Sequence, residues 1–219
     1  MDDNDLKIVG AIKHLFHERP IIFDIGANRG NYTDYVLSLI PDAKMVLAEP
    51  NQIWKEHLYI KYHHKGYRIF NDIIGNKHEV VPFYYFTNNN DQLSSIYKRP
   101  IFDDLPMQET REYCRTIDNI LDFCSFEKVD FIKVDTEGAE FDVLKGSAFS
   151  LLNKKINFIQ IEYGGTYPDA GITMKEIIRF VNEFGYNVYS YDKTFEKLDA
   201  ETFVEDFHYD NYLITHYAL

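Results

Sequence analysis

The sequence predicts an α/β fold with a mostly parallel β-sheet and helices on both of its faces. Short apolar runs alternate along the chain with segments whose apolar residues recur at helical spacing, a pattern typical of βαβ units. Several of these runs also end on a carboxylate or just before one, which gathers polar groups at one edge of the sheet. A chain of 219 residues is long enough to bury a core of its own, and we expect a single domain spanning 1–219.

The first half of the chain is expected to contain three strands separated by helices. The first apolar run begins after Pro20 and stops at Gly26, as a short buried strand does. The helix that follows is closed by Pro41, and Asn51 can cap the next helix. The expected order is a strand at 21–25, a helix at 31–40, a strand at 45–48, a helix from 51 and a strand at 67–71.

An insertion interrupts this alternation before it resumes in the second half of the chain. Residues 79–86 have the pattern of an extra strand and 87–91 are turn-forming, so we interpret 76–116 as an insertion rather than as a second domain. The last two strands are separated only by a loop, and we expect them to pair as an antiparallel hairpin. The expected order is a helix at 118–123, a strand at 130–134, a helix to 152, a strand at 156–161, a helix at 174–184, and strands at 186–191 and 209–215.

Charge and composition exclude several classes of protein. The chain carries 23 Lys and Arg against 35 Asp and Glu, a net charge of −12, which repels the phosphate backbone of a nucleic acid. Cys114 and Cys124 lack the spacing of a disulfide framework or a zinc site, so we expect a cytoplasmic protein. No apolar run reaches the about 18 residues of a membrane span, and the acidic N-terminus is unlike a signal peptide. The sequence leaves the oligomeric state open.

Candidate functional residues follow four of the expected strands. In an open α/β sheet, ligands bind beyond the carboxyl ends of the strands, and acidic side chains occur at each of these four ends. The structural explanation for some of them is the helix dipole, which favours an acidic residue in the first turn by about 0.3–1 kcal/mol. The four segments are 24–30, 49–51, 135–137 and 162–164.

The turn after the first strand excludes two common cofactor motifs. Asn28 and Asn31 occupy the second and third glycine positions of the dinucleotide-binding motif, so the spacing for NAD fails. The chain also contains no P-loop motif for a nucleoside triphosphate.

The residues that remain favour S-adenosylmethionine. The tight turn contains Gly26 and Gly30, begins with the acidic Asp24 and lies beside Glu49 at the end of the second strand. Asp24 and the turn suit a positively charged amino-acid end, and the carboxylate of Glu49 suits the two hydroxyls of a ribose. The alternative is a simple glycine turn beside a surface glutamate.

Two segments of the sequence resemble the FkbM family of S-adenosylmethionine-dependent methyltransferases. They are Phe-Asp-Ile-Gly-Ala-Asn-Arg-Gly-Asn at 23–31 and Asp-Phe-Ile-Lys-Val-Asp-Thr-Glu-Gly-Ala-Glu at 130–140, and 143–146, 159–163 and 211–213 fit the same family. The first segment alone is typical of class I methyltransferases in general. The resemblance implies a Rossmann-like class I methyltransferase fold with a seven-stranded sheet. It also implies methyl transfer to a hydroxyl, often of a sugar or a polyketide-like alcohol.

Asp135, Glu137 and Glu162 are the candidate catalytic residues. Besides alignment, methyl transfer to oxygen needs a group that takes up the hydroxyl proton. These carboxylates follow the strands that lie across the site from Asp24. Helix capping and pairing with lysine are their structural alternatives. They can also hold a magnesium ion, which prefers one or two carboxylates plus waters and substrate oxygens, although their spacing assigns no metal ligand.

The remaining candidates for cofactor binding come from less specific patterns. Asp72 follows the third strand, where class I methyltransferases commonly contact adenine, although Asn-Asp is also ordinary turn chemistry. Ser95 resembles a serine of the family that lies near the cofactor, although serines are common in loops. The expected cofactor site is completed by residues beside those already named: Asn28, Asn31, Pro50 and Asn51.

We therefore expect an S-adenosylmethionine-dependent O-methyltransferase that acts on a sugar, a glycan or a related small molecule, with acceptor recognition by the insertion and the later loops. Three alternatives stay open. The chain can bind S-adenosylmethionine without catalysis, and it can be a nucleotide-sugar oxidoreductase that binds NAD. It can also methylate a phosphorylated metabolite if Arg99, Arg111 or Arg115 faces the site.

Overall fold

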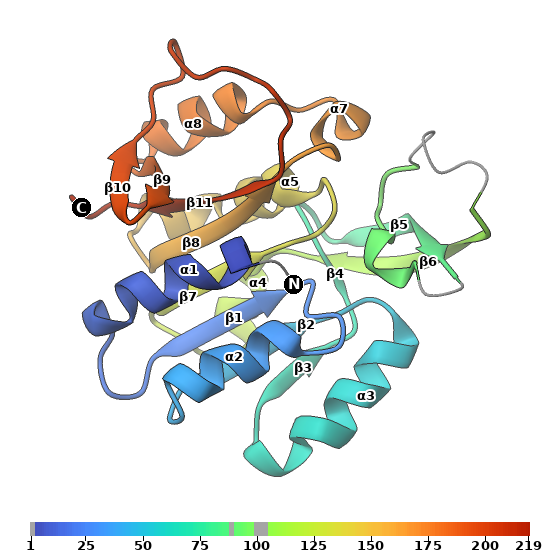
Figure 1. The fold of residues 1–219 in the computed structure, drawn as a ribbon. Coiled ribbons are helices and arrows are strands. Elements are labelled where there is room, and N and C mark those ends of the chain that lie inside the picture. Colours follow the sequence, from blue (N-terminus) through green and yellow to red (C-terminus); the bar gives the residue numbers. More distant parts are fainter. Residues whose placement is uncertain (1–2, 88–89, 99–104) are drawn as a thin grey trace.

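A mixed β-sheet forms the centre of the fold (Figure 1). The computed structural model describes residues 3–87, 90–98 and 105–219, and in this part of the chain the sheet has eight strands in the order β10-β9-β11-β8-β7-β1-β2-β3. The strands from β8 to β3 are parallel, and β11 is antiparallel to both β8 and β9. Their bounds are β1 Ile21–Ile25, β2 Lys44–Ala48, β3 Arg68–Phe70, β7 Val129–Val134, β8 Ile156–Tyr163, β9 Asn187–Asp192, β10 Thr194–Lys197 and β11 Asp210–Thr215.

The predicted fold class is confirmed, but the sheet has one strand more than the seven expected. The additional strand is β10, in a segment that the sequence analysis assigned to a loop. Lys193 adopts a left-handed conformation (φ 67°) that turns the chain back on itself, and Phe195 then packs on Tyr191. The expected antiparallel pairing of the last two strands is present between β11 and β9, but β11 inserts between β9 and β8.

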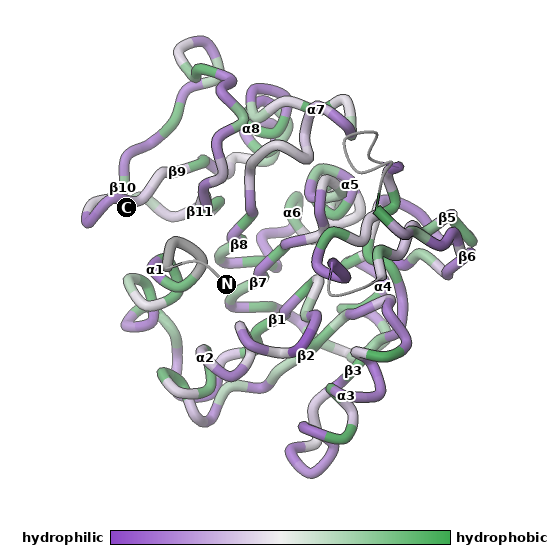
Figure 2. Tube along the Cα trace, turned by 45° about the vertical axis from the view of Figure 1, so that its right-hand side comes forward, coloured by the Kyte–Doolittle hydropathy of each residue, from purple (hydrophilic) through white to green (hydrophobic). Residues whose placement is uncertain are grey.

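Helices cover both faces of the sheet and create two cores. One core packs α1, α2 and α3 on one face, and the other packs α4 to α8 on the opposite face. Hydrophobic residues gather along the central strands between them (Figure 2). The helices are α1 Asp3–Ile12, α2 Asn31–Leu39, α3 Gln52–Tyr62, α4 Ile117–Phe123, α5 Glu140–Lys145, α6 Ala148–Leu152, α7 Tyr167–Ala170 and α8 Met174–Glu183, with short 3₁₀ turns at Lys13–Leu15 and His63–Lys65.

Two features of the helical layers differ from the expectation. No helix was expected before the first strand, whereas α1 packs there through Ile8, Val9 and Ile12. The helix expected to run to 152 is divided into α5 and α6. The division falls at Gly146, which lies so close to Gly75 that a side chain there would overlap the carbonyl oxygen of Gly75.

The segment interpreted as an insertion forms most of a second, smaller sheet. This sheet has the order β4-β6-β5 and lies to one side of the main sheet (Figure 1). Its strands are β4 Ile73–Ile74, β5 Glu79–Phe86 and β6 Met107–Arg115, and a 3₁₀ turn at Asp91–Leu93 follows β5. Of the described helices, none combines the length and apolar character that crossing a bilayer requires.

Candidate functional site

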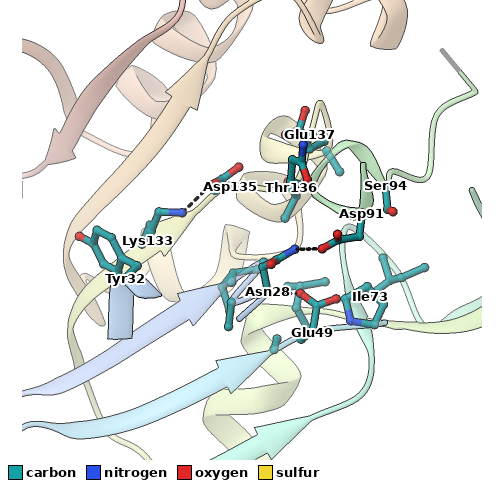
Figure 3. A pocket seen from close by; sticks show the side chains of 18 of the residues that line it. Asn28, Tyr32, Glu49, Ile73, Asp91, Ser94, Lys133, Asp135, Thr136 and Glu137 are labelled. Carbon is teal, nitrogen blue, oxygen red and sulfur yellow. Dashed lines mark hydrogen bonds and ion pairs between the residues drawn. The ribbon is translucent and has the colours of Figure 1, made fainter. Parts of the chain in front are cut away.

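A cavity of about 500 Å³ lies at the carboxyl ends of β1, β2, β7 and β8 (Figure 3). Its wall comes from the loops after these strands, from the start of α2 and from the segment between β5 and β6. The structure therefore brings most of the predicted site residues together. Those that line the cavity are Gly26, Asn28, Asn31, Glu49, Pro50, Asp72, Asp135, Glu137 and Glu162, whereas Asp24, Gly30, Asn51 and Ser95 lie outside its lining.

The two glycines of the turn after β1 are required by packing. Gly26 has a φ of 82°, and a Cβ there would overlap the carbonyl oxygen of Asp135 in the neighbouring loop. Gly30 has a φ of 77° and lies against Leu58 and Tyr62 of α3. The left-handed backbone and the close approach both favour glycine at these positions. The glycines thus hold the turn against its neighbours.

Glu49 fixes the shape of this turn through its carboxylate. Its Oε2 accepts the N–H of Asn28 at 2.7 Å, and its Oε1 accepts the N–H of Asn51 at 2.8 Å. The side chain is only 6% exposed, and burial raises its pKa to about 7 against the opposing effect of these two hydrogen bonds. Each oxygen keeps acceptor capacity for a further donor, because an ionised carboxylate has about four acceptor sites.

Asp24 lies beneath the cavity wall, fully buried. Its Oδ2 accepts the hydroxyl of Thr33 at 2.6 Å, and its Oδ1 has no hydrogen-bond partner among the described residues. Burial raises the pKa of Asp24, and the positive charge of Lys133 opposes that shift. Any influence of Asp24 on a ligand is therefore electrostatic and comes from below the wall.

Asn51 and Asp72, both predicted to bind the cofactor, have hydrogen-bond partners within the protein. Asn51 caps α3, because its Oδ1 accepts the N–H of Ile53 at 3.0 Å. Asp72 lines the cavity at the end of β3, and its Oδ2 accepts Nε of Arg115 at 2.9 Å. Both side chains are therefore held in place by the fold itself.

The loop after β7 has a tight backbone that the surrounding residues stabilise. Glu137 and Gly138 both have a positive φ, 56° and 105°. The carboxylate of the buried Glu140 accepts the N–H groups of Thr136 at 2.7 Å and of Gly138 at 3.0 Å. The hydroxyl of Ser95, a predicted cofactor contact, donates instead to the carbonyl oxygen of Glu137 at 2.7 Å. These hydrogen bonds hold the backbone at Glu137 in one conformation.

The three predicted catalytic carboxylates meet in one cluster. Asp135, Glu137 and Glu162 offer oxygens that all lie within 4.8 Å of one another. Nζ of Lys133 forms an ion pair with Oδ2 of Asp135 at 2.7 Å (Figure 3). Burial, reinforced by the charges of Asp135 and Glu137, raises the pKa of Glu162 far above its usual range. The raised pKa keeps Glu162 protonated at neutral pH.

Asp91, which no sequence pattern singled out, joins the insertion to the turn after β1. Its carboxylate accepts Nε1 of Trp54 at 2.7 Å and Nη2 of Arg29 at 3.0 Å. It also accepts Nδ2 of Asn28 at 3.3 Å (Figure 3). The Arg29 guanidinium also lies over the Trp54 ring, 4.6 Å from its centroid. A turn-forming Asp gives no signal of such a role, because its partners are distant in sequence.

The fold and the site define the class of protein. An open sheet with parallel strands β3-β2-β1-β7-β8, an acidic and glycine-containing turn after β1 and an acid after β2 are the architecture of class I methyltransferases. The family model for the FkbM methyltransferase domain matches residues 24–188. The chain belongs to this family, and the resemblance found in the sequence is confirmed.

Solved structures show the same fold at low sequence identity. The methyltransferase FkbM from Methylobacillus flagellatus KT has a TM-score of 0.58 and 18% identity, covering 91% of this chain and 44% of that one. This chain thus spans less than half of that protein. An rRNA methylase from Streptococcus thermophilus and a putative rRNA methylase from Clostridium thermocellum each have a TM-score of 0.52 and 9% identity, covering 98% of both chains. The search of curated proteins found no match.

The packing role of Gly26 can be tested against Gly66, which has a similar φ of 70° but nothing within 4 Å of an added Cβ. We expect Gly66→Ala to cost only the backbone strain, about 1–2 kcal/mol. Gly26→Ala adds the overlap with Asp135 and should cost about 2–5 kcal/mol in total. Urea unfolding monitored by circular dichroism measures both, and equal losses would contradict the packing argument.

Proposed function

We propose that this chain is an S-adenosylmethionine-dependent methyltransferase that methylates a hydroxyl of a sugar, a glycan or a related polyol. The observation that carries the proposal is one cavity that contains both Glu49 and the cluster of Asp135, Glu137 and Glu162. The residues present fit the cofactor. Glu49 retains acceptor capacity for ribose hydroxyls, and beneath the wall the buried Oδ1 of Asp24 has no hydrogen-bond partner among the described residues.

The bound cofactor supplies an electrophilic methyl group on a sulfonium, so the protein's tasks are alignment and proton removal. Glu49 and the turn it fixes orient the nucleoside. Glu162, protonated at neutral pH, donates a hydrogen bond that holds the acceptor oxygen. Glu137, in the loop after β7 that Ser95 and Glu140 hold in place, accepts the hydroxyl proton, and Lys133 forms an ion pair with the neighbouring Asp135.

The charge of the cavity favours a neutral acceptor. Its described lining contains six acidic side chains, at positions 49, 72, 91, 135, 137 and 162, against two basic ones, Arg29 and Lys133. Even with Glu162 protonated, the acidic side chains outnumber the basic ones. A phosphorylated metabolite would be repelled by this lining. The arginines considered as phosphate ligands do not support that alternative, because Arg111 and Arg115 lie outside the lining and Arg99 lies outside the described residues. Vicinal hydroxyls, in contrast, are donors that carboxylates accept.

A magnesium ion is a second occupant that the geometry of the carboxylate cluster permits, because hard cations prefer such oxygens. We favour the proton-accepting role, since the ammonium of Lys133 already neutralises Asp135. A chelator distinguishes the two, because it abolishes turnover only if a metal takes part.

Methyl transfer can be tested with radiolabelled S-adenosylmethionine and a panel of nucleotide sugars and glycans, with and without a chelator. We expect label in at least one acceptor. Glu137→Gln should lower kcat about 10²- to 10⁴-fold while calorimetry shows unchanged cofactor affinity. Glu109→Gln, on the exposed part of β6, is the matched control and should retain full activity. Tight cofactor binding without transfer to any acceptor would favour a non-catalytic binding protein.

The raised pKa of Glu49 predicts how cofactor affinity varies with pH. With a pKa of about 7, Glu49 is ionised at pH 8 and accepts the ribose hydroxyls, whereas at pH 6 it is mostly protonated and loses acceptor capacity. Affinity for S-adenosylhomocysteine should therefore fall about tenfold from pH 8 to pH 6. Calorimetry at several pH values measures this, and Glu49→Gln should bind weakly with no such dependence. If the affinity of Glu49→Gln still fell about tenfold from pH 8 to pH 6, the pH dependence would belong to another group.

A further inference from the structure

Lys133 and Asp24 are a buried lysine and a buried aspartate on neighbouring strands below the cavity. They are register partners on the neighbouring parallel strands β7 and β1. Both side chains are on the face of the sheet that α1 and α2 cover, because Phe131 and Ile22, two positions earlier on the same strands, belong to that core. Lys133 is 4% exposed and Asp24 fully buried, yet Lys133 lines the cavity. An ammonium and a carboxylate thus lie one strand apart below the site.

The surroundings of Lys133 hold its ammonium in one place. Nζ pairs with Oδ2 of Asp135 at 2.7 Å and lies 5.1 Å from the centroid of the Tyr32 ring (Figure 3). Tyr32 is itself fixed by the hydrogen bond from its hydroxyl to Oε1 of Gln160 at 3.1 Å. The ammonium is therefore a positioned charge rather than the end of a mobile side chain.

Lys133 is also the only buried cation of the described lining. The other lining cation, Arg29, has a side chain 45% exposed and pairs with Asp91 of the insertion. The rest of the charged lining is acidic, and an anionic group on a ligand is repelled by it unless it meets a cation. Of the two lining cations, Lys133 is therefore the buried one that a ligand carboxylate can meet.

The strand order relates Lys133 to the expected position of the amino-acid end of the proposed cofactor. If the ribose and adenine occupy the ends of β2 and β3, at Glu49 and Asp72, the rest of the molecule extends over the next strands in the sheet. Those strands are β1 and β7, which carry Asp24 and Lys133. The α-amino acid end is a zwitterion, and in this placement it would lie over Lys133 of the lining and over the buried Asp24 beneath the wall.

We propose that Lys133 binds the α-carboxylate of S-adenosylmethionine, while Asp24 attracts the adjacent α-ammonium group from beneath the wall. This inference rests on the proposed function of the same cavity. It gives Lys133 a role beyond its ion pair with Asp135, and it makes the lysine a determinant of specificity for cofactors that carry a carboxylate.

Calorimetry can compare the affinities of the protein for S-adenosylmethionine and for its decarboxylated analogue, which lacks only the carboxylate. The wild-type protein should bind S-adenosylmethionine at least about tenfold more tightly than the analogue. Lys133→Met should weaken S-adenosylmethionine binding about 10- to 100-fold and change analogue binding less than about threefold, so that the preference disappears. Lys133→Arg should retain part of it. Lys145→Met, which removes a lysine paired with Asp142 outside the cavity lining, is the matched control and should preserve both affinities.

Three results would overturn the proposal. The first is that the wild-type protein binds the two ligands with equal affinity. The second is that Lys133→Met weakens the binding of both ligands equally, and the third is that this variant binds S-adenosylmethionine as tightly as the wild-type protein does. Because the wild-type comparison needs no substitution, the proposal stays testable even if Lys133→Met fails to fold with Asp135 unpaired. Binding of neither ligand to the wild-type protein would instead refute the proposed function itself.

Discussion

The close approach of the turn after β1 to the loop after β7 is the constraint on which the site depends. The N–H of Asp135 donates to the carbonyl oxygen of Ile25 at 3.0 Å, and the N–H of Gly26 donates to that of Ala48 at 3.0 Å. These bonds tie the ends of β7, β1 and β2 together at a point where a side chain larger than hydrogen does not fit. As a result, the acid after β2 and the carboxylates after β7 face a single cavity instead of two separate surfaces.

The buried acidic residues around this cavity separate into two kinds by their partners. Burial raises the pKa of Glu140 and Glu49 to about 7 in each case. Glu140 accepts two backbone N–H groups and a hydroxyl, and it lies outside the cavity lining, so its role is to hold a loop. Glu49 and Glu162 line the cavity, and Glu162 is surrounded by further acids. Burying such groups is costly without a compensating ligand or proton, which is why perturbed carboxylates in a cleft mark functional sites.

The sequence predicts the strands and the acidic ends of this fold well, because apolar runs and strand-end carboxylates are local signals. β10 was missed since its residues are mostly exposed and its structure comes from pairing with β9. The positions of most lining residues at the strand ends could be predicted from the sequence, but their hydrogen-bond and ion-pair partners could not. That Glu49 binds the backbone of Asn28 and Asn51 depends on how β1 and β2 pair. The roles of Asp91 and Lys133 likewise arise from contacts that only the tertiary structure creates.

The same contacts argue against a dinucleotide in this cavity. A pyrophosphate approaches a glycine turn to accept its backbone N–H groups, and it needs a glycine for that approach. Here the N–H of Asn28 already donates to Glu49, so the amide that a phosphate would require is taken by a carboxylate. A phosphate at that point would also lie beside the negative charges of Glu49 and Asp91. A ligand whose centre is a cationic sulfonium experiences the opposite force from the same residues, and the electrostatics of the turn therefore favour it over NAD.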